Sequence, residues 1–340
     1  MVGSPPQAVN EIPLVRIADI DPAGLFAADL DGRNLVISRG GLHLLDLKSG
    51  SKQKLSSESP VALVWSLDGL VLAAAFPITD YETRLTLYSS QGSLLHETLL
   101  PVVVSQMIWS VRGDLLVTGF ALKTYSFGGN LRQVLYRVDT EKVVERVLAD
   151  TSLKPATAKT LAPIMQSVQP VIFSPHGDEL VFVKLHDPPA FSPYLQLRYM
   201  NWESGEERSL GKIPLQSLRF FWREPAASVD VMAQTENFSL PLWSSVDVSV
   251  EKLRIPLYRF VKGRLYYGEK LLADWGGEAR LQILANGRYL LAQKGRLYLG
   301  DGLQSAPRVV YSKKAWTLRR WRFEGLITPD EYLNLSERKP

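Results

Sequence analysis

The chain has 340 residues, of which 46% are hydrophobic and 22% charged, and its formal net charge is +4. These values are those of an ordinary globular protein, and so small a charge does not indicate nucleic-acid binding without a localised basic patch. The complete absence of cysteine excludes disulfides, thiolate nucleophiles and thiolate-bound metal centres.

The N-terminal stretch and the hydropathy pattern bear on the compartment. Residues 1–11 are rich in proline and polar side chains, and we expect a mobile lead-in there. They show no basic segment followed by an apolar one, so no signal peptide is visible. No apolar run approaches the ~18 residues that span a bilayer. The sequence as written therefore predicts a soluble cytoplasmic protein, or a periplasmic one if a signal peptide has been removed.

After the lead-in, short apolar segments alternate with tight polar turns. A candidate strand at 12–20 comes first. The first repeat then places apolar runs on both sides of Asp31-Gly32, a dipeptide that favours a hairpin because glycine reaches positive φ at little cost. Two further strands, at 42–47 and ending near Leu55, complete a unit of four strands.

The same unit recurs along the chain. Clear copies follow at 61–100, 107–148, 173–210 and 281–311, and a weaker region at 214–275 predicts strands at 218–223, 228–232 and within 258–274. Four-stranded units repeating every ~40–45 residues predict an all-β chain folded as a β-propeller. The spacing gives about seven blades, with six as the alternative, and we place this domain at 12–312. A β-sandwich is the rival fold, but its strands would not return to the same turn pattern.

One copy carries a family resemblance. Its turn reads Ser174-Pro175-His176-Gly177-Asp178-Glu179-Leu180-Val181-Phe182, and Ser66-Leu67-Asp68-Gly69 and Ser110-Val111-Arg112-Gly113 match it more loosely. The pattern resembles the repeat of TolB-like propellers and of the wider WD40-like family, over roughly residues 20–312. The Gly-His and Trp-Asp dipeptides of WD40 repeats proper are missing. The resemblance implies the fold and no particular function, because such propellers scaffold many partners.

Long connections are expected at 77–83, 121–133 and 185–194, and between two repeats at 150–169. In a propeller all four would emerge on one face, and long loops beside minimal hairpins are commonly functional. This face carries Tyr81, Tyr125, Phe127, His186, Phe191 and Tyr194, with Lys154 and Lys159 nearby. Exposed aromatic residues anchor protein interfaces, so we take the first six as candidate partner-binding residues. The alternative is that they pack down over strand ends.

Motifs of known catalytic and cofactor sites are absent: there is no G-x-S-x-G, phosphate-binding loop, G-x-G-x-x-G or H-E-x-x-H. His43 is expected to pack within a strand, and His176 occupies a turn position that Asp holds elsewhere. His186-Asp187 offers two metal ligands, which do not make a site. We therefore predict no catalytic residue, no metal and no cofactor. The alternative is an enzyme of the hydrolase or lyase type with a polar site at the channel mouth.

Residues 313–340 are expected to form a helical tail. A first helix would end at Gly325, and Thr328, Pro329 and Glu331 form the capping box of a second. The pattern resembles the short C-terminal (SHOCT-type) domain of bacterial proteins, through Leu318, Gly325, Leu326, Ile327, Thr328, Glu331 and Tyr332. The resemblance implies a bacterial origin and a role in oligomerisation or protein contact.

The first tail helix is both basic and aromatic. Its candidate contact residues are Trp316, Arg319, Arg320 and Trp321. The more specific interpretation is that this helix binds nucleic acid or an anionic membrane surface. We favour an amphipathic pair packed on the propeller or on another protein, because the basic and aromatic residues spread around the helix and the second helix is acidic. The sequence therefore predicts a non-enzymatic scaffold that binds a protein or peptide through its long-loop face and its tail, without a nucleic-acid ligand.

Overall fold

The structure is a computed structural model. It describes residues 14–21, 24–29, 31–110, 113–126, 128–138, 143–157, 171–173, 179–188, 191–202, 204–214, 218–223, 228–233, 237–241, 258–261, 263–267, 270–284 and 287–303. These residues are almost entirely β-strand, and none of their helices is long and apolar enough to cross a membrane. The lead-in at 1–11 and the expected helical tail at 313–340 lie outside the described residues.

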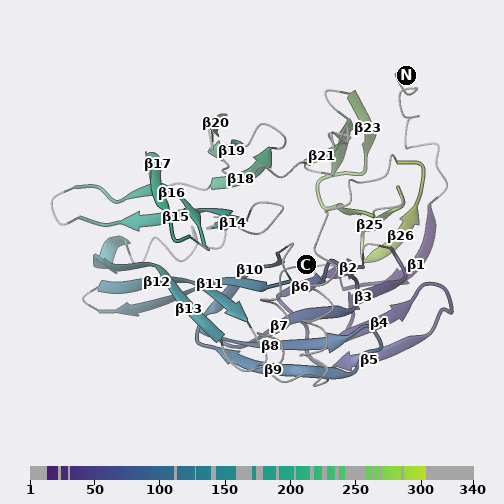
Figure 1. Cartoon of the computed structure of the whole chain (residues 1–340). Helices are drawn as coiled ribbons and strands as arrows, with labels where there is room; N and C mark the ends of the chain where they lie inside the picture. Colours follow the sequence, from purple (N-terminus) through teal and green to yellow (C-terminus); the bar gives the residue numbers. More distant parts are fainter. Residues whose placement is uncertain are drawn as a thin grey trace, which may run out of the picture. The chain divides into compact units, whose positions relative to one another are not determined.

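The strands form antiparallel sheets whose members follow one another along the chain (Figure 1). The first sheet contains β2 (Phe26–Ala28), β3 (Asn34–Ser38), β4 (Leu42–Asp46) and β5 (Lys52–Ser56). The second contains β6 (Ala62–Trp65), β7 (Val71–Thr79), β8 (Glu82–Ser89) and β9 (Leu94–Leu100). The third contains β10 (Val103–Trp109), β11 (Leu115–Tyr125), β12 (Gly128–Val138) and β13 (Val143–Leu153). The fourth contains β14 (Val171–Phe173), β15 (Glu179–His186), β16 (Tyr194–Asn201) and β17 (Glu207–Pro214).

Two further sheets have three strands each among the described residues. One contains β18 (Leu218–Arg223), β19 (Ser228–Ala233) and β20 (Asn237–Pro241). The other contains β21 (Tyr258–Val261), β22 (Arg264–Tyr267) and β23 (Lys270–Asp274). The strands predicted in the weak region of the sequence are thus confirmed.

The last sheet joins the two ends of the strand-forming chain. It contains β24 (Arg280–Ile283), β25 (Tyr289–Gln293) and β26 (Arg296–Gly300), and β1 (Val15–Asp19) pairs with β26. The register runs from Val15 opposite Leu299 to Asp19 opposite Arg296, and the two strands lie side by side in Figure 1. The strand predicted before the first repeat is confirmed, but it completes the last sheet, a place that the repeat pattern assigned to residues near 308–311. Successive four-stranded antiparallel sheets closed by a strand from the other end of the chain define a β-propeller architecture.

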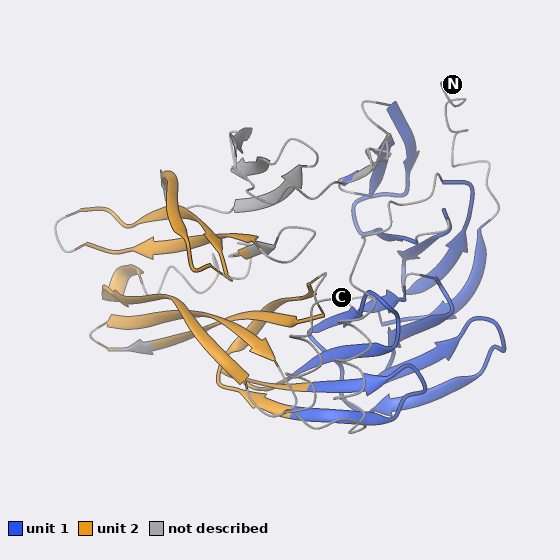
Figure 2. Cartoon of the chain, viewed as in Figure 1, with its two compact units in different colours: residues 1–76, 86–97, 249–310 blue, residues 77–85, 98–248, 311–340 orange. Residues whose placement is uncertain are grey.

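The chain divides into two compact units (Figure 2). Unit 1 comprises residues 1–76, 86–97 and 249–310, and unit 2 comprises residues 77–85, 98–248 and 311–340.

The tight turn between the first two strands of a sheet is built by one recurring device. The backbone N–H of Gly32 donates to Asp29 O at 3.0 Å, and that of Gly69 donates to Ser66 O at 2.9 Å. Both glycines have positive φ, 65° and 72°, which other residues adopt only at a cost. The Asp29 carboxylate accepts the N–H of Arg33 at 2.8 Å, so the residue three positions before the glycine caps the turn. This device explains why the turn pattern returns in the sequence.

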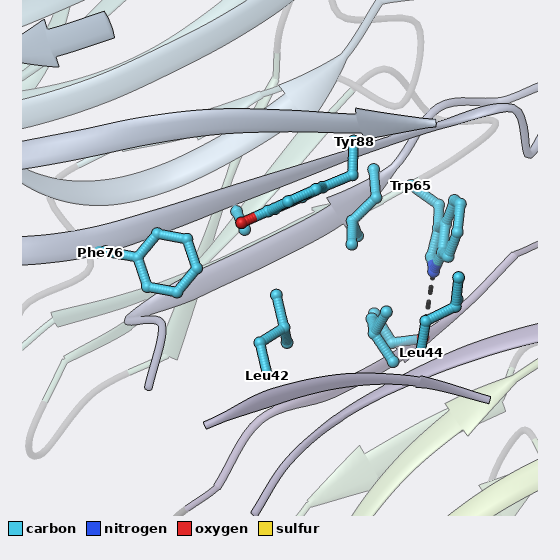
Figure 3. Packing of buried hydrophobic residues seen from close by; sticks show 9 residues of the cluster. Leu42, Leu44, Trp65, Phe76 and Tyr88 are labelled. Atoms are coloured by element: carbon cyan, nitrogen blue, oxygen red, sulfur yellow. Dashed lines mark hydrogen bonds between the residues drawn. The ribbon is translucent and has the colours of Figure 1, made fainter. Parts of the chain in front are cut away.

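The strands bury their apolar faces between neighbouring sheets. In unit 1, one cluster joins the β2–β5 and β6–β9 sheets and includes Leu42, Leu44, Trp65, Phe76 and Tyr88 (Figure 3). In unit 2, a second cluster joins the β10–β13 and β14–β17 sheets through Leu116, Leu135, Leu180, Phe182 and Met200. Each large side chain buried in this way stabilises the fold by about 1.5–3 kcal/mol.

The prediction of a long loop is wrong for two segments, because their residues extend strands. β7 continues to Thr79 and β8 begins at Glu82, so 77–83 is the end of a hairpin. Residues 121–125 and 128–133 belong to β11 and β12, a second long hairpin in which Tyr125 lies opposite Gly128. Polar residues alternating with apolar ones suit a strand that faces solvent on one side, and this alternation resembles a loop when only composition is considered. β13 likewise extends to Leu153, into the connection expected from residue 150.

Candidate functional site

The loop end of the β15–β16 hairpin brings three sequence-predicted residues together. His186 ends β15 and Tyr194 begins β16, and the register places them directly opposite each other. Their rings stack with 5.0 Å between centroids and an interplanar angle of 10°. Opposed aromatic pairs of this kind stabilise a sheet by about 0.2–1 kcal/mol. Phe191 belongs to the connection between these strands, and we call this region, with Lys154 and Asp187, the β15–β16 corner.

Lys154, which follows β13, fixes the connection between β15 and β16. Its backbone N–H donates to Asp187 Oδ2 at 2.6 Å, and its ammonium lies 3.3 Å from Asp187 Oδ1. The same ammonium donates to the carbonyl oxygen of Phe191 at 2.9 Å. The Asp187 side chain is fully buried, and a buried carboxylate requires a partner of opposite charge. Lys154 therefore neutralises Asp187 and ties it to the backbone of Phe191.

The side chain of Phe191 is exposed to solvent, although its backbone carbonyl accepts a hydrogen bond from Lys154. Its relative exposure is 73%, the highest among the exposed large hydrophobic residues of the described chain. An apolar ring kept in water by a fixed backbone loses little conformational entropy when a partner covers it. Phe191 thus combines an exposed ring with a hydrogen-bonded carbonyl oxygen.

A row of polar side chains crosses the sheet beside the corner. Lys184 on β15 lies opposite Gln196 on β16, which lies opposite Lys212 on β17. The Gln196 Oε1 atom and the His186 Nε2 atom are 3.0 Å apart and share a hydrogen bond. The Lys212 ammonium lies 4.9 Å from the centroid of the Tyr194 ring, within cation–π distance. The stacked rings and the polar row thus belong to one continuous face.

Among the other predicted residues, the structure describes the side chain of Tyr81 alone. Tyr81 is 52% exposed at the tip of the β7–β8 hairpin. Tyr125 ends β11, with its side chain outside the description, and Phe127 lies outside the described residues. Lys159 and the four tail residues Trp316, Arg319, Arg320 and Trp321 also lie outside them.

Unit 2 contains a second polar surface, a hollow on the β10–β13 sheet of about 470 Å³. Its charged groups contact one another: Glu145 pairs with Arg132 and accepts a hydrogen bond from the Tyr136 hydroxyl at 2.9 Å. Asn130 Nδ2 donates to Asp150 Oδ1 at 2.6 Å. Burial, and then the neighbouring Glu145, raise the pKa of Tyr136, which keeps this phenol protonated. The hollow is internally satisfied, apart from the exposed side chain of Lys123 on its edge.

In unit 1, a smaller hollow of about 330 Å³ is lined by the first strands of three sheets, β2, β6 and β24. Gln282 clamps β2, because its side chain accepts the N–H of Ala28 and donates to the Ala28 carbonyl, both at 3.0 Å. The Trp65 indole N–H donates to Ala27 O at 3.1 Å (Figure 3). The Gln282 side chain thereby supplies hydrogen bonds that the free edge of β2 would otherwise lack.

Two of the histidines take structural places at the strands of the sheets, His43 in β4 and His186 at the end of β15. His43 is half-buried in β4, with its Nε2 atom 3.1 Å from Arg39 O, as its expected packing role requires. Burial, and then Lys52, lower its pKa. Asp187, which adjoins His186, is paired with Lys154. Among the described residues no group of three or more histidine and carboxylate side chains lies close enough to hold a metal ion.

Sequence reasoning missed part of the site. It ended the fourth strand of the sheet at Leu210, whereas β17 continues to Pro214 and carries Lys212. The alternation of apolar and polar residues in β16 could have shown that Gln196 and Tyr194 share a face. No local pattern could have paired Lys154 with Asp187, because 33 positions separate them.

No protein-family model and no curated protein matches this chain in sequence. Several solved structures resemble it in fold. The β-propeller domain of the Trilobed protease from Pyrococcus furiosus is 13% identical, with 84% of this chain and 85% of that chain covered and a TM-score of 0.39. The WD40 domain of SCAP from fission yeast is 12% identical, with coverages of 83% and 66% and a TM-score of 0.39. TolB from Acinetobacter baumannii is 12% identical, with coverages of 64% and 55% and a TM-score of 0.29. The fold assignment rests on the strand pairing described above.

Proposed function

We propose that this protein is a binding module that engages a protein or peptide partner through the β15–β16 corner. The observation that carries the proposal is Phe191, whose ring is 73% exposed while its carbonyl is held by Lys154. Contact surfaces gain most of their affinity from a few such anchors, and an anchor that is already fixed costs little entropy on binding.

The surroundings of Phe191 support this role. The stacked His186–Tyr194 pair is half-buried and lies at the ends of the two strands that the connection carrying Phe191 joins. The pair between buried Asp187 and partly exposed Lys154 stabilises the connection that carries Phe191. A loop that served only to join two strands would not need a buried carboxylate, which costs desolvation energy.

A selection from a displayed library of random twelve-residue peptides tests the proposal. The full chain serves as bait, and enriched peptides are rescreened against Phe191→Ala and against Leu94→Ala. Leu94 is the matched control, because it is also an exposed hydrophobic residue, at 61%, and lies on β9 outside the corner. We expect peptides that bind wild type and Leu94→Ala and lose at least about tenfold in affinity with Phe191→Ala, the effect of removing a hot-spot residue. Enrichment that is absent, or that survives Phe191→Ala unchanged, contradicts the proposal.

The proposal extends to parts of the chain beyond the corner. We infer seven blades, supported by the seven sheets in the described residues. We also propose that residues 313–340 form a helical tail that mediates oligomerisation or a second contact, through Trp316, Arg319, Arg320 and Trp321. Light scattering and peptide anisotropy, each on the full chain and on a chain ending at residue 312, test the tail. We expect a smaller oligomer or weaker peptide binding without the tail, and an unchanged oligomeric state together with unchanged affinity contradicts this part.

A further inference from the structure

The face beside the β15–β16 corner has an excess of positive charge. The side chains of Lys184 and Lys212 form no ion pair and no hydrogen bond among the residues that the structure describes, and that of Lys212 contacts the Tyr194 ring. The neighbouring acids are occupied. Asp187 is buried against Lys154, and Glu207 accepts a hydrogen bond from Arg198 Nε at 2.7 Å.

The two free lysines are spaced by the sheet itself. They lie on β15 and β17, directly across from Gln196 on the strand between them. Neighbouring strands are ~4.8 Å apart, so the two lysines are anchored about 10 Å from each other. An extended peptide advances ~3.3 Å per residue, which places carboxylates two to three residues apart within reach of both ammonium groups.

We propose that the partner of this site is an acidic peptide segment, in which an apolar side chain meets Phe191 and flanking carboxylates meet Lys184 and Lys212. This inference rests on the proposed function and specifies the chemistry of its ligand. Opposite charges at the rim of an interface supply selectivity and faster association. The Gln196 amide between the two lysines is engaged within the sheet, since its Oε1 atom meets His186 and its Nε2 atom donates to Ser209 Oγ at 3.0 Å. The two lysines are therefore the groups of this row that remain for a ligand.

A peptide fits this surface better than a nucleic acid does. Single-stranded nucleic acids are bound by stacking bases on free aromatic faces within a long basic groove. Here the Tyr194 ring is stacked on His186 from β15 and contacted by Lys212 from β17. The ring is therefore engaged from the strands on both sides, and in the described part of this face the free cations are two rather than a continuous track.

The test starts from peptides selected on the full chain and uses synthetic pairs in which every Glu and Asp is replaced by Gln and Asn. Affinities are measured by fluorescence anisotropy at low and high salt, with a twelve-nucleotide oligouridine as competitor. The variants are Lys184→Gln/Lys212→Gln and, as a charge-matched control, Lys52→Gln/Lys54→Gln, whose exposed lysines lie on β5. A melting curve of each variant confirms that it folds.

We expect the acidic member of each pair to bind about three- to tenfold more tightly, which is the worth of two exposed ion pairs, and to lose this advantage at high salt. Lys184→Gln/Lys212→Gln should remove the preference, and the control should keep it. Peptides that bind through Phe191 with equal affinity in both forms overturn the inference and leave the proposed function intact. Oligouridine that competes fully for the same lysines overturns it in favour of a nucleic-acid ligand. A failure to obtain any Phe191-dependent peptide defeats the proposed function itself.

Discussion

Two polar surfaces of unit 2 use similar residues in opposite ways. The hollow on the β10–β13 sheet pairs Arg132 with Glu145 and Tyr136, so its charges satisfy one another. The face beside the β15–β16 corner leaves Lys184 and Lys212 without ion pairs in the described chain and places Phe191 in solvent. The hollow is therefore a weaker candidate for a binding site than the face beside the β15–β16 corner. Groups that are already bonded to each other must be separated before they can bind anything else, whereas free groups need no such separation.

The largest expected effect comes from removing the ion pair under the corner. Lys154→Met leaves the buried Asp187 without its countercharge, and we expect the free energy of unfolding to fall by about 2 kcal/mol. The loss stays below that of a fully buried pair because Lys154 is 35% exposed and because its backbone N–H still bonds Asp187. Peptide affinity should fall at the same time, since Phe191 loses its support. Urea unfolding and anisotropy measure the two quantities.

Lys123→Met is the control for that experiment, because Lys123 is an exposed lysine on the edge of the hollow. We expect its unfolding free energy to change by less than about 0.5 kcal/mol. Equal destabilisation by the two variants would show that the Lys154–Asp187 ion pair does not stabilise the corner.

A smaller effect on stability is expected from breaking the ion pair in the hollow. Glu145→Gln removes the ion pair with Arg132, whose side chain is 44% exposed, and should cost less than about 1 kcal/mol of stability. Peptide affinity should not change, because these residues lie on a different sheet from Phe191. A loss of affinity in this variant would move the binding site to the hollow.

The smallest effect concerns pH. The pKa of Tyr136 is raised by burial and then by Glu145, so the folded state retains this proton more strongly than the unfolded chain does. Its contribution to stability is present below the unfolded pKa of about 10 and is lost as the pH rises above it. Tyr136→Phe should therefore lose less stability than wild type between pH 9 and pH 11 in urea unfolding. Parallel losses in both proteins would refute a titrating role for Tyr136.

The sequence predicts the fold better than the site, for physical reasons. Each turn is local, since Asp29 and Gly32 close a hydrogen bond across three positions, and local bonds leave a repeating pattern. The site depends on pairings between distant residues. Lys154 and Asp187 come into contact only after two sheets have packed. Likewise, β1 pairs with β26, which lies at the other end of the strand-forming chain. His186, Phe191 and Tyr194 could be selected as exposed-loop residues, but their division into a stacked pair and a free anchor required the strand register.

Hydrogen–deuterium exchange of the full chain with and without a saturating selected peptide tests the central claim most directly. We predict that bound peptide slows exchange at 184–196 and 207–214, and leaves the hollow strands 128–138 and 143–150 unchanged. Protection confined to the hollow strands, or protection at 184–196 that persists in Phe191→Ala, would contradict the assignment of binding to the β15–β16 corner.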